Sequence, residues 1–264
     1  MKHLIRDILI WVISALGFAL RYRKQKRSEG PLVRILCFHD VPKHDWFLKV
    51  ITFCNEQYNV LSPEQFFRKE FSSQKINILF TFDDGYQSWV DVALPALARS
   101  DSKGLFFVNS GLLAVAEDKE AVADYMESNL RVVPKLALTD AGVASLITAG
   151  HTIGGHTVSH QDLTTLTPET ASQEVLQDRD YFTKHFGITP EDFAYPFGNV
   201  AHCSETLTQM IVKNGYKRVY SGQTGFFTAA DSLIPRTLVE KNQSLRSLRL
   251  WIEGGYDIFS RLKN

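Results

Sequence analysis

Short apolar runs that alternate with amphipathic segments constrain the fold of this chain more than any other feature of its sequence. The runs are Leu32–Phe38, Ile76–Phe82, Gly104–Val108, Phe193–Pro196, Arg218–Tyr220 and Ile234–Val239. Each is short enough for a strand, and the longer ones are apolar on both faces, which is typical of strands in a parallel sheet. Because amphipathic segments lie between them, the sequence predicts an α/β fold built on an open parallel sheet or a barrel.

The segments between the runs carry helix signals. Phe47–Tyr58 and Gln87–Arg99 are predicted helices, and Pro95 is expected to bend the second one. Thr139 is the predicted N-cap of a helix that ends near residue 149. Thr167 is the predicted N-cap of a longer helix that has proline at its first position and ends near residue 186.

The N-terminus carries an apolar run of 13 residues, Ile8–Leu20, followed at once by RYRKQKR. A helix that spans a bilayer needs about 20 apolar residues. We therefore predict that residues 1–27 associate with a membrane surface, as a short span or an interfacial helix, with an export signal as the alternative. The basic cluster favours the cytoplasmic face, and the alternative is a periplasmic or cell-surface protein. Residues 1–30 would then be a membrane-associating segment and linker, and residues 31–264 the folded domain.

Charge and cysteine content exclude several function classes. Residues 1–30 carry seven basic and two acidic side chains, so the remaining residues of this neutral chain sum to −5. A negative body argues against nucleic-acid binding. The three cysteines are widely spaced without a C-x-x-C pair, so neither a disulfide framework nor a thiolate metal site is predicted. Residues 111–137 fit no clear pattern and are predicted to be an insertion.

Two adjacent carboxylates follow the predicted strand Ile76–Phe82. Asp83 and Asp84 would repel each other and would be costly to desolvate beside a buried run unless a cation paired them. A solvated Asp-Asp-Gly turn is the alternative interpretation, because such turns are common. The segment is therefore a candidate cation site.

Two histidines, His156 and His160, follow the glycine pair Gly154-Gly155. If the segment is helical, side chains four residues apart can converge on one metal ion, and the glycines allow a close backbone approach. Two histidines on one exposed face are the alternative. Because parallel strands end at one rim, the sheet would bring these histidines to the two carboxylates. Two imidazoles and one carboxylate leave a position for water, which is typical of catalytic zinc.

Four ordered motifs resemble those of the polysaccharide deacetylases of the NodB-homology group, carbohydrate esterase family four. The motifs are ILFTFDDGY, LITAGHTIGGHTVSHQDL, FAYPFG, and NGYKRVY followed by LIPR. The resemblance spans about Val33 to Val239, which is most of the chain. It implies a distorted (β/α) barrel with fewer than eight regular strands, preceded here by the N-terminal hydrophobic and basic helix.

The resemblance also implies roles for individual residues. Asp83 would be the general base, and Asp84, His156 and His160 would bind a divalent metal ion. Zinc is the expected ion, and cobalt, nickel or iron would suit the same ligands.

The resemblance further implies how substrate is held. Pro196 and Phe197 would help to form the acetyl-binding pocket, with the backbone N–H of Phe197 as a donor to the oxyanion. Independently of the resemblance, most aromatic residues are expected to be core residues, although Tyr86 or Trp46 could stack on a sugar ring.

The sequence departs from the family pattern at two positions. The family usually has an arginine two residues before the proline of its third motif, where it braces the catalytic aspartate, and this chain has Ala194 there. Arg236 is the candidate substitute, with a surface or substrate-contacting arginine as the alternative.

The family's C-terminal general-acid histidine is also missing. His39, in LCFHD, resembles the acid of the circularly permuted branch that includes poly-N-acetylglucosamine deacetylases. A core histidine is the alternative, and Asp40 would orient His39 or cap the turn.

These roles predict a metal-dependent hydrolase that removes N-acetyl groups from an N-acetylhexosamine-containing glycan or glycolipid and releases acetate. Two alternatives stay open. One is an O-acetyl esterase or a non-sugar amidase on the same scaffold. The other is a non-catalytic glycan-binding protein, an interpretation that Ala194 favours.

Overall fold

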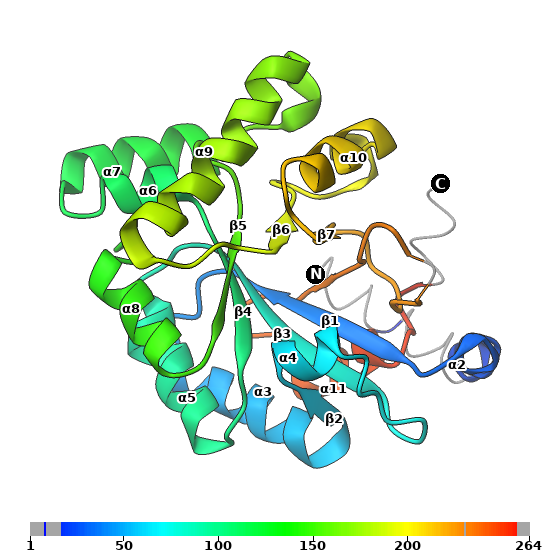
Figure 1. The fold of residues 1–264 in the computed structure, drawn as a ribbon. Coiled ribbons are helices and arrows are strands. Elements are labelled where there is room, and N and C mark those ends of the chain that lie inside the picture. The colour runs from blue at the N-terminus through cyan, green and yellow to red at the C-terminus, as the bar shows by residue number, and fades with distance from the viewer. Residues whose placement is uncertain (1–7, 9–16, 230, 258–264) are drawn as a thin grey trace.

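Eight parallel strands form one curled sheet at the centre of this computed structural model, which describes residues 8, 17–229 and 231–257 (Figure 1). The strands are β1 (Val33–Phe38), β2 (Asn59–Leu61), β3 (Asn77–Asp84), β4 (Gly104–Val108), β5 (Thr152–Gly155), β6 (Asp192–Ala194), β7 (Arg218–Tyr220) and β8 (Thr237–Leu238). Their order is β7-β6-β5-β4-β3-β1-β8, and β2 pairs with β3 outside this path. Because these pairs are parallel, the carboxyl ends of the strands share one end of the sheet.

The segment that ends in β8 closes the curl of the sheet. Ile234 forms a parallel bridge to Tyr220 in β7, and a few residues later β8 pairs with β1. We predicted a strand over Ile234–Val239, but only two of its residues form regular strand, because the chain passes from one neighbour to the other. The resulting distorted (β/α) barrel confirms the predicted fold class.

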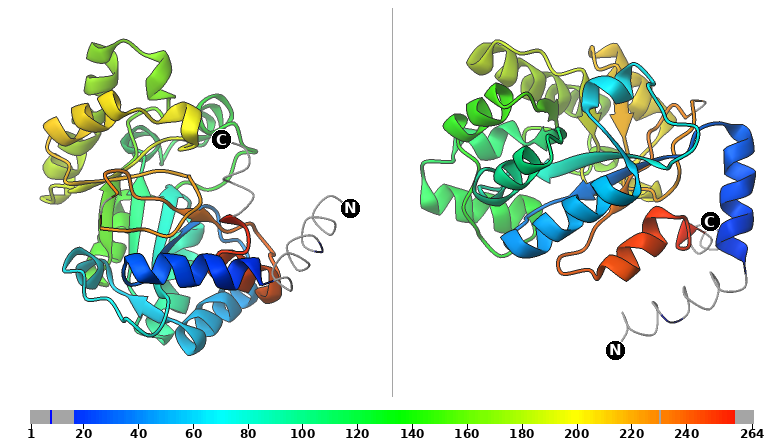
Figure 2. Two further views of the ribbon diagram at one scale, coloured as in Figure 1. Left: turned by 90° about the vertical axis from the view of Figure 1, so that its right-hand side faces the viewer. Right: turned by 90° about the horizontal axis from the view of Figure 1, so that it is seen from below.

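Helices and single helical turns surround the sheet as an outer layer (Figures 1 and 2). The α-helices are α2 (Phe18–Glu29), α3 (His44–Gln57), α4 (Pro63–Phe67), α5 (Leu94–Arg99), α6 (Ser110–Ala114), α7 (Lys119–Tyr125), α8 (Asp140–Thr148), α9 (Pro168–Phe186), α10 (Glu205–Lys213) and α11 (Leu245–Ile252). The other turns are the π-helical η1 (Trp89–Ala93) and η2 (Met126–Leu130) and the 3₁₀-helical η3 (Leu163–Thr165) and η4 (Val200–His202). Thr139 and Thr167 cap α8 and α9 as predicted, and the expected bend near Pro95 is the change from η1 to α5.

Residues 111–137, which we predicted to be an insertion because they fit no clear pattern, are largely helical. This segment contains most of α6, then α7 and η2. The helices are short, and each buries only one to three side chains, so no apolar period is long enough to reveal them in the sequence. Val122, Met126 and Leu130 pack into the main hydrophobic core.

The pleat of β3 separates an outer and an inner row of side chains. Phe80 and Phe82 pack in the core under the outer helices, whereas Leu79 packs inside the barrel. Since side chains alternate along a strand, Thr81 and Asp83 continue the inner row. The inner row therefore changes from apolar to polar towards the carboxyl end of the strand, and Asp83 lies where the barrel opens.

The basic helix α2 lies at the end of the barrel where β1 begins (Figures 1 and 2). Arg23 pairs with Glu253, and Arg27 donates to the backbone oxygens of Ser73 and Gln74. Most of the apolar run Ile8–Leu20, for which we predicted membrane association, lies outside the described residues. Within the part of the chain that the structure describes, no helix is both long enough and apolar enough to cross a bilayer.

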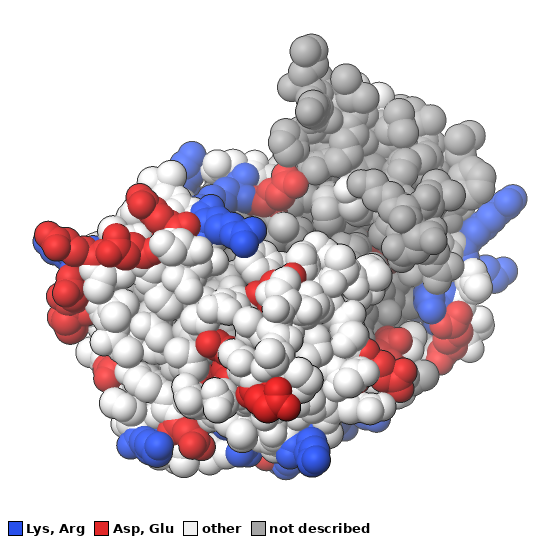
Figure 3. Space-filling model, turned by 90° about the horizontal axis from the view of Figure 1, so that it is seen from above, with Lys and Arg blue, Asp and Glu red and all other residues white. Residues whose placement is uncertain are grey.

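Where the face seen from above is not covered by grey atoms, it is mostly uncharged, with a few acidic side chains among the uncharged ones in its middle (Figure 3). Acidic and basic side chains are interspersed along its edges. The visible part of this face therefore shows no basic stripe of the kind that marks many nucleic-acid-binding surfaces.

Candidate metal centre and active site

A cavity of about 620 Å³ opens at the carboxyl ends of the strands. This volume is typical of a pocket for a small ligand or a sugar unit. Residues far apart in the sequence line it, and they come from the ends of β1, β3 and β5, from the segment after β6 and from the segment that contains β8. The predicted site residues in its wall are His39, Asp83, Tyr86, Asp84, His156, His160, Phe197 and Arg236.

Asp84, His156 and His160 form a compact group of possible metal ligands. Asp84 Oδ1 lies 3.6 Å from His156 Nε2 and 3.5 Å from His160 Nε2. All three residues are buried, and Asp84 Oδ1 has no hydrogen-bond partner. Ligands bonded at about 2.1 Å to one tetrahedral ion are about 3.4 Å apart. The orphaned buried oxygen and the two ring nitrogens therefore fit a single divalent ion.

Backbone carbonyls orient both histidine rings. His156 Nδ1 lies 2.7 Å from the oxygen of Ala194, and His160 Nδ1 lies 3.3 Å from that of Asn129. A carbonyl can only accept, so each Nδ1 carries the proton and each Nε2 presents its lone pair. Burial also lowers the pKa of His160 to about 4, which keeps that ring neutral. The tautomers that a metal ion requires are thus set by the fold.

The segment from His156 to His160 is an irregular loop after β5, so the helical spacing that we considered for the two histidines was wrong. Thr157 and His160 have positive φ values of 69° and 51°, which α-helical backbone does not allow. The loop instead turns the second ring back towards the first, and the ring centroids are 5.0 Å apart. Convergence arises from strained backbone, which the sequence spacing does not reveal.

Asp178 is a positioning residue that the sequence analysis missed. Its carboxylate accepts hydrogen bonds from the backbone N–H groups of His156 and Ser110, both at 3.0 Å. Burial raises its pKa to about 7. On α9 it lies on the same face as the buried residues Val175 and Phe182. A carboxylate on the apolar face of an amphipathic helix is the sequence pattern that could have revealed it.

Gly155 is needed where α9 approaches the end of β5. A Cβ atom there would lie 2.6 Å from Asp178 Oδ2 and 2.1 Å from the hydroxyl of Tyr216. The expected role of the glycine pair in close backbone approach is therefore seen at this position.

Asp83 and Arg236 form a buried, bidentate ion pair. Arg236 Nη1 and Nη2 donate to Asp83 Oδ1 and Oδ2 at 2.6 and 2.7 Å, and Arg236 Nε donates to the oxygen of Ser221. Burial is the largest single influence and opposes ionisation of Asp83, but the charge and hydrogen bonds of Arg236, together with the nearby His156 and His39, lower the pKa of the carboxyl. Arg236 thus makes the contact that we predicted for it in place of an arginine at position 194.

Replacing Arg236 by methionine is expected to lower the free energy of unfolding by about 3–5 kcal/mol, because Asp83 is then buried without a cation. Adding Asp83→Asn to this variant should restore part of the loss, since a neutral amide costs less to bury than a carboxylate. Urea denaturation of the two variants measures both effects. A single variant as stable as the wild type, or a double variant no more stable than the single one, contradicts this account of the pair.

His39 follows β1 and lies beside Asp83. One of its ring nitrogens is within 4.8 Å of a carboxylate oxygen of Asp83, and its backbone oxygen accepts a hydrogen bond from Trp89. Asp40 contacts other groups: its carboxylate accepts from Ser88, Lys135 and Lys241. Asp40 therefore ties two loops at the rim of the cavity, and these bonds give no support to the idea that it orients His39.

The predicted substrate contacts Phe197 and Tyr86 both line the cavity. Phe197 is 38% exposed and has a positive φ of 61°, and its ring lies 4.8 Å from that of His160, measured between centroids. Pro196 is buried, and the residues on either side of it, Tyr195 and Phe197, line the wall. Tyr86 is buried, and burial and the nearby Asp84 carboxylate raise the pKa of its phenol, so the hydroxyl stays protonated.

Comparison with known proteins places the sequence motifs in one family. The profile described as "Polysaccharide deacetylase" matches residues 72–219. The Bacillus subtilis (strain 168) protein YxkH, whose name assigns it provisionally to the polysaccharide deacetylases, is 23% identical over 188 residues. That alignment covers 70% of this chain and 60% of YxkH, so the chain spans less than two thirds of this relative.

Solved structures show the same fold. The Streptococcus pyogenes deacetylase PplD, determined in complex with acetate, is 24% identical, with a TM-score of 0.69 over 84% of this chain and 98% of PplD. IcaB from Ammonifex degensii is 18% identical, with a TM-score of 0.67 over 85% of this chain and 98% of that protein. At such low identity these similarities establish the fold alone.

Proposed function

This chain belongs to the polysaccharide deacetylase family, and from that premise we propose that it removes N-acetyl groups from an N-acetylhexosamine-containing glycan or glycolipid and releases acetate. Removal of acetyl groups from glycans by hydrolysis is the reaction of the family. The observation that carries the proposal is the arrangement of Asp84, His156 and His160 next to the Asp83–Arg236 pair at one cavity wall. The known deacetylase PplD, with acetate bound, shares the fold and supports the same reaction class.

We assign Asp84, His156 and His160 as ligands of one divalent ion, with zinc as the expected metal. When bound, such an ion supplies a Lewis acid that polarises a carbonyl oxygen and lowers the pKa of water. Cobalt, nickel and iron accept the same donors, so the ligand set does not select among them.

Asp83 is proposed as the general base. Its pairing with Arg236 keeps the carboxylate charged although it is buried, and the pair fixes its orientation towards the cavity. A charged carboxylate held in this way accepts a proton from the attacking water. Positioned bases of this kind typically contribute about 10²–10⁴-fold to the rate.

His39 is proposed as the general acid. An amide nitrogen leaves as an amine only if it is protonated, because a free amide anion is a very poor leaving group. His39 lines the same cavity as Asp83 and directly follows the neighbouring strand β1, so it can donate to the departing nitrogen.

Phe197 and Pro196 are proposed to hold the acetyl group. The positive φ of Phe197 results from a tight turn in which Gly198 N–H donates to the oxygen of Pro196 at 2.6 Å. We assign the backbone N–H of Phe197 as a donor to the developing oxyanion, and Tyr86 lines the same cavity.

Acetate release from a panel of substrates tests the proposed function. We expect release from N-acetylglucosamine oligomers, and we expect His39→Gln to slow this amide hydrolysis much more than hydrolysis of a phenyl acetate, whose leaving group needs no proton. Faster release from O-acetylated sugars than from N-acetylated ones would favour the esterase alternative. Glycan binding with no acetate release from any member would favour the non-catalytic alternative.

A further inference from the structure

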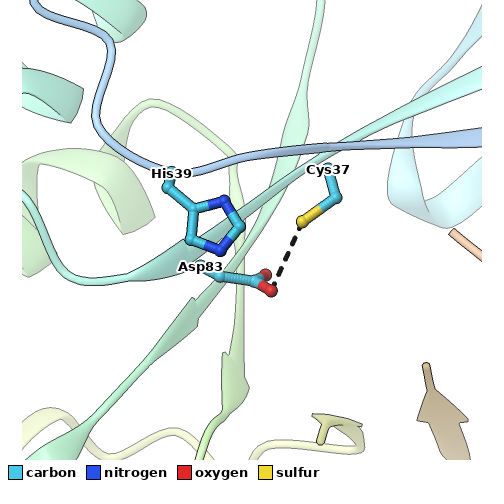
Figure 4. Close-up of side chains that lie close together, drawn as sticks. All are labelled: Cys37, His39 and Asp83. Carbon is cyan, nitrogen blue, oxygen red and sulfur yellow. Dashed lines mark hydrogen bonds between the residues drawn. The ribbon is translucent and has the colours of Figure 1, made fainter. Parts of the chain in front are cut away.

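A second group of possible metal ligands lies beside the first, and it contains a thiol that no proposed step uses. Cys37 Sγ, a ring nitrogen of His39 and a carboxylate oxygen of Asp83 all lie within 4.8 Å of one another. The three side chains point toward one another (Figure 4). The sequence analysis predicted no thiolate site, because the three cysteines are widely spaced and form no C-x-x-C pair.

The pairing of β1 with β3 brings the group together. Cys37 is opposite Thr81 in the register of the two strands, so its side chain lies next to Asp83, which follows in the same inner row. His39 follows at the end of β1, where the strand opens into the cavity. Two of the ligands thus come from neighbouring strands on one face of the sheet, two residues apart in register, and the third comes from the loop after β1.

The distance between sulfur and oxygen suits a shared ion. The Cys37 thiol donates a hydrogen bond to Asp83 Oδ2 over 3.4 Å. Zinc bonds to sulfur at about 2.3 Å and to oxygen at about 2.1 Å, so a tetrahedral ion would hold these atoms about 3.6 Å apart. An ion can therefore take the place of the thiol proton, which is released to solvent as the thiolate binds.

The surroundings of this site leave it accessible from the cavity but lower its affinity for a metal ion. Cys37 is 4% and Asp83 3% exposed, yet both line the cavity together with His39. Arg236 donates to both oxygens of Asp83, and its positive charge opposes a second cation nearby. Thiolate, imidazole and carboxylate together suit zinc and cadmium better than magnesium or calcium.

We propose that Cys37, His39 and Asp83 form a second, inhibitory site for a thiophilic divalent ion such as zinc or cadmium. An ion bound there occupies the nitrogen of His39 and an oxygen of Asp83, so neither group can transfer a proton. Because Arg236 weakens binding, the ion enters only when it is in excess over the first site. The inhibitory effect rests on the proposed function, whereas binding of the ion does not.

Cadmium titration of the protein loaded with one equivalent of zinc tests binding. A cadmium–thiolate bond has an ultraviolet charge-transfer absorption, and the first site contains no sulfur, so exchange there is silent. We expect the absorption to grow in the wild type and to be absent in Cys37→Ser. Cys203→Ser is the control, because Cys203 is partly exposed and lies outside this group, and this variant should show the same absorption as the wild type. No absorption in the wild type, or the same absorption in Cys37→Ser, overturns the proposal.

Inhibition by excess zinc provides the second measurement. Cys37→Ala is expected to need at least about tenfold more zinc than the wild type for half inhibition, the equivalent of about 1.4 kcal/mol of ion binding. Equal inhibition of both proteins overturns the inhibitory role. If none of the proteins releases acetate under any condition, the proposed function fails, and the cadmium absorption alone decides whether the site exists.

Discussion

Replacing Asp83 by asparagine is expected to lower the rate of acetate release by about 10²–10⁴-fold, the typical contribution of a positioned general base. Asparagine has nearly the same shape as aspartate and can still accept from Arg236, but it cannot take a proton from water. Because Asp83 is not one of the three proposed ligands, the metal content of the purified variant should match that of the wild type. The measurement is steady-state acetate release together with metal analysis of the same sample.

A buried aspartate elsewhere in the fold provides a matched control. Asp192 is 1% exposed and pairs with Arg218 at 2.6 Å, in the same kind of ion pair as Asp83 with Arg236. Asp192→Asn should therefore disturb stability to a similar degree while its folded fraction keeps full activity. If Asp83→Asn retains more than a tenth of the activity, or if it loses its metal ion, the assignment of Asp83 as the base is wrong.

Replacing His156 by glutamine, alone or with His160→Gln, is expected to reduce both metal content and activity. The substitution removes the ring nitrogen Nε2, which lies 3.6 Å from Asp84 Oδ1, from the proposed ligand set. If the ion is lost with it, that buried oxygen is left without a compensating charge. We expect acetate release to fall by at least about 10²–10³-fold, since loss of a single oxyanion donor already costs that much in well-studied hydrolases. Metal analysis and acetate release on the same preparation measure the two effects.

His151 offers the control for this substitution. It is buried just before β5, and its Nδ1 accepts from the backbone N–H of Gly104, on the barrel wall outside the cavity. His151→Gln should keep the metal ion and the activity. A His156→Gln protein that binds as much metal as His151→Gln does would show that His156 is not a ligand.

Much of the fold could be predicted from the sequence, because its strands are apolar enough to be recognised one by one. Gly104–Val108 was predicted with the bounds that the structure shows, and the start of α9 was set by Thr167 and the proline after it. β5 was missed because its sequence, TIGG, is half glycine and carries no strand propensity. The structure forms it by pairing with β4 on one side and β6 on the other.

The site was only partly readable from the sequence. From the sequence alone we could predict that the carboxylates and histidines at the strand ends lie close together, because parallel strands end at a common rim. The loop geometry of Thr157 and His160, the support from Asp178 and the proximity of Cys37 to Asp83 all depend on tertiary contacts and strained backbone. The pattern of residue types along the sequence does not predict such tertiary contacts or backbone conformations.

Exhaustive removal of divalent ions tests the central claim most directly, which is that Asp84, His156 and His160 hold one ion that deacetylation requires. After dialysis against a chelator, acetate release by the wild type should fall to background and should return when about one equivalent of zinc per chain is added back. In His156→Gln combined with His160→Gln, the same addition should restore nothing. Undiminished acetate release from wild-type protein shown to be free of metal would contradict the account.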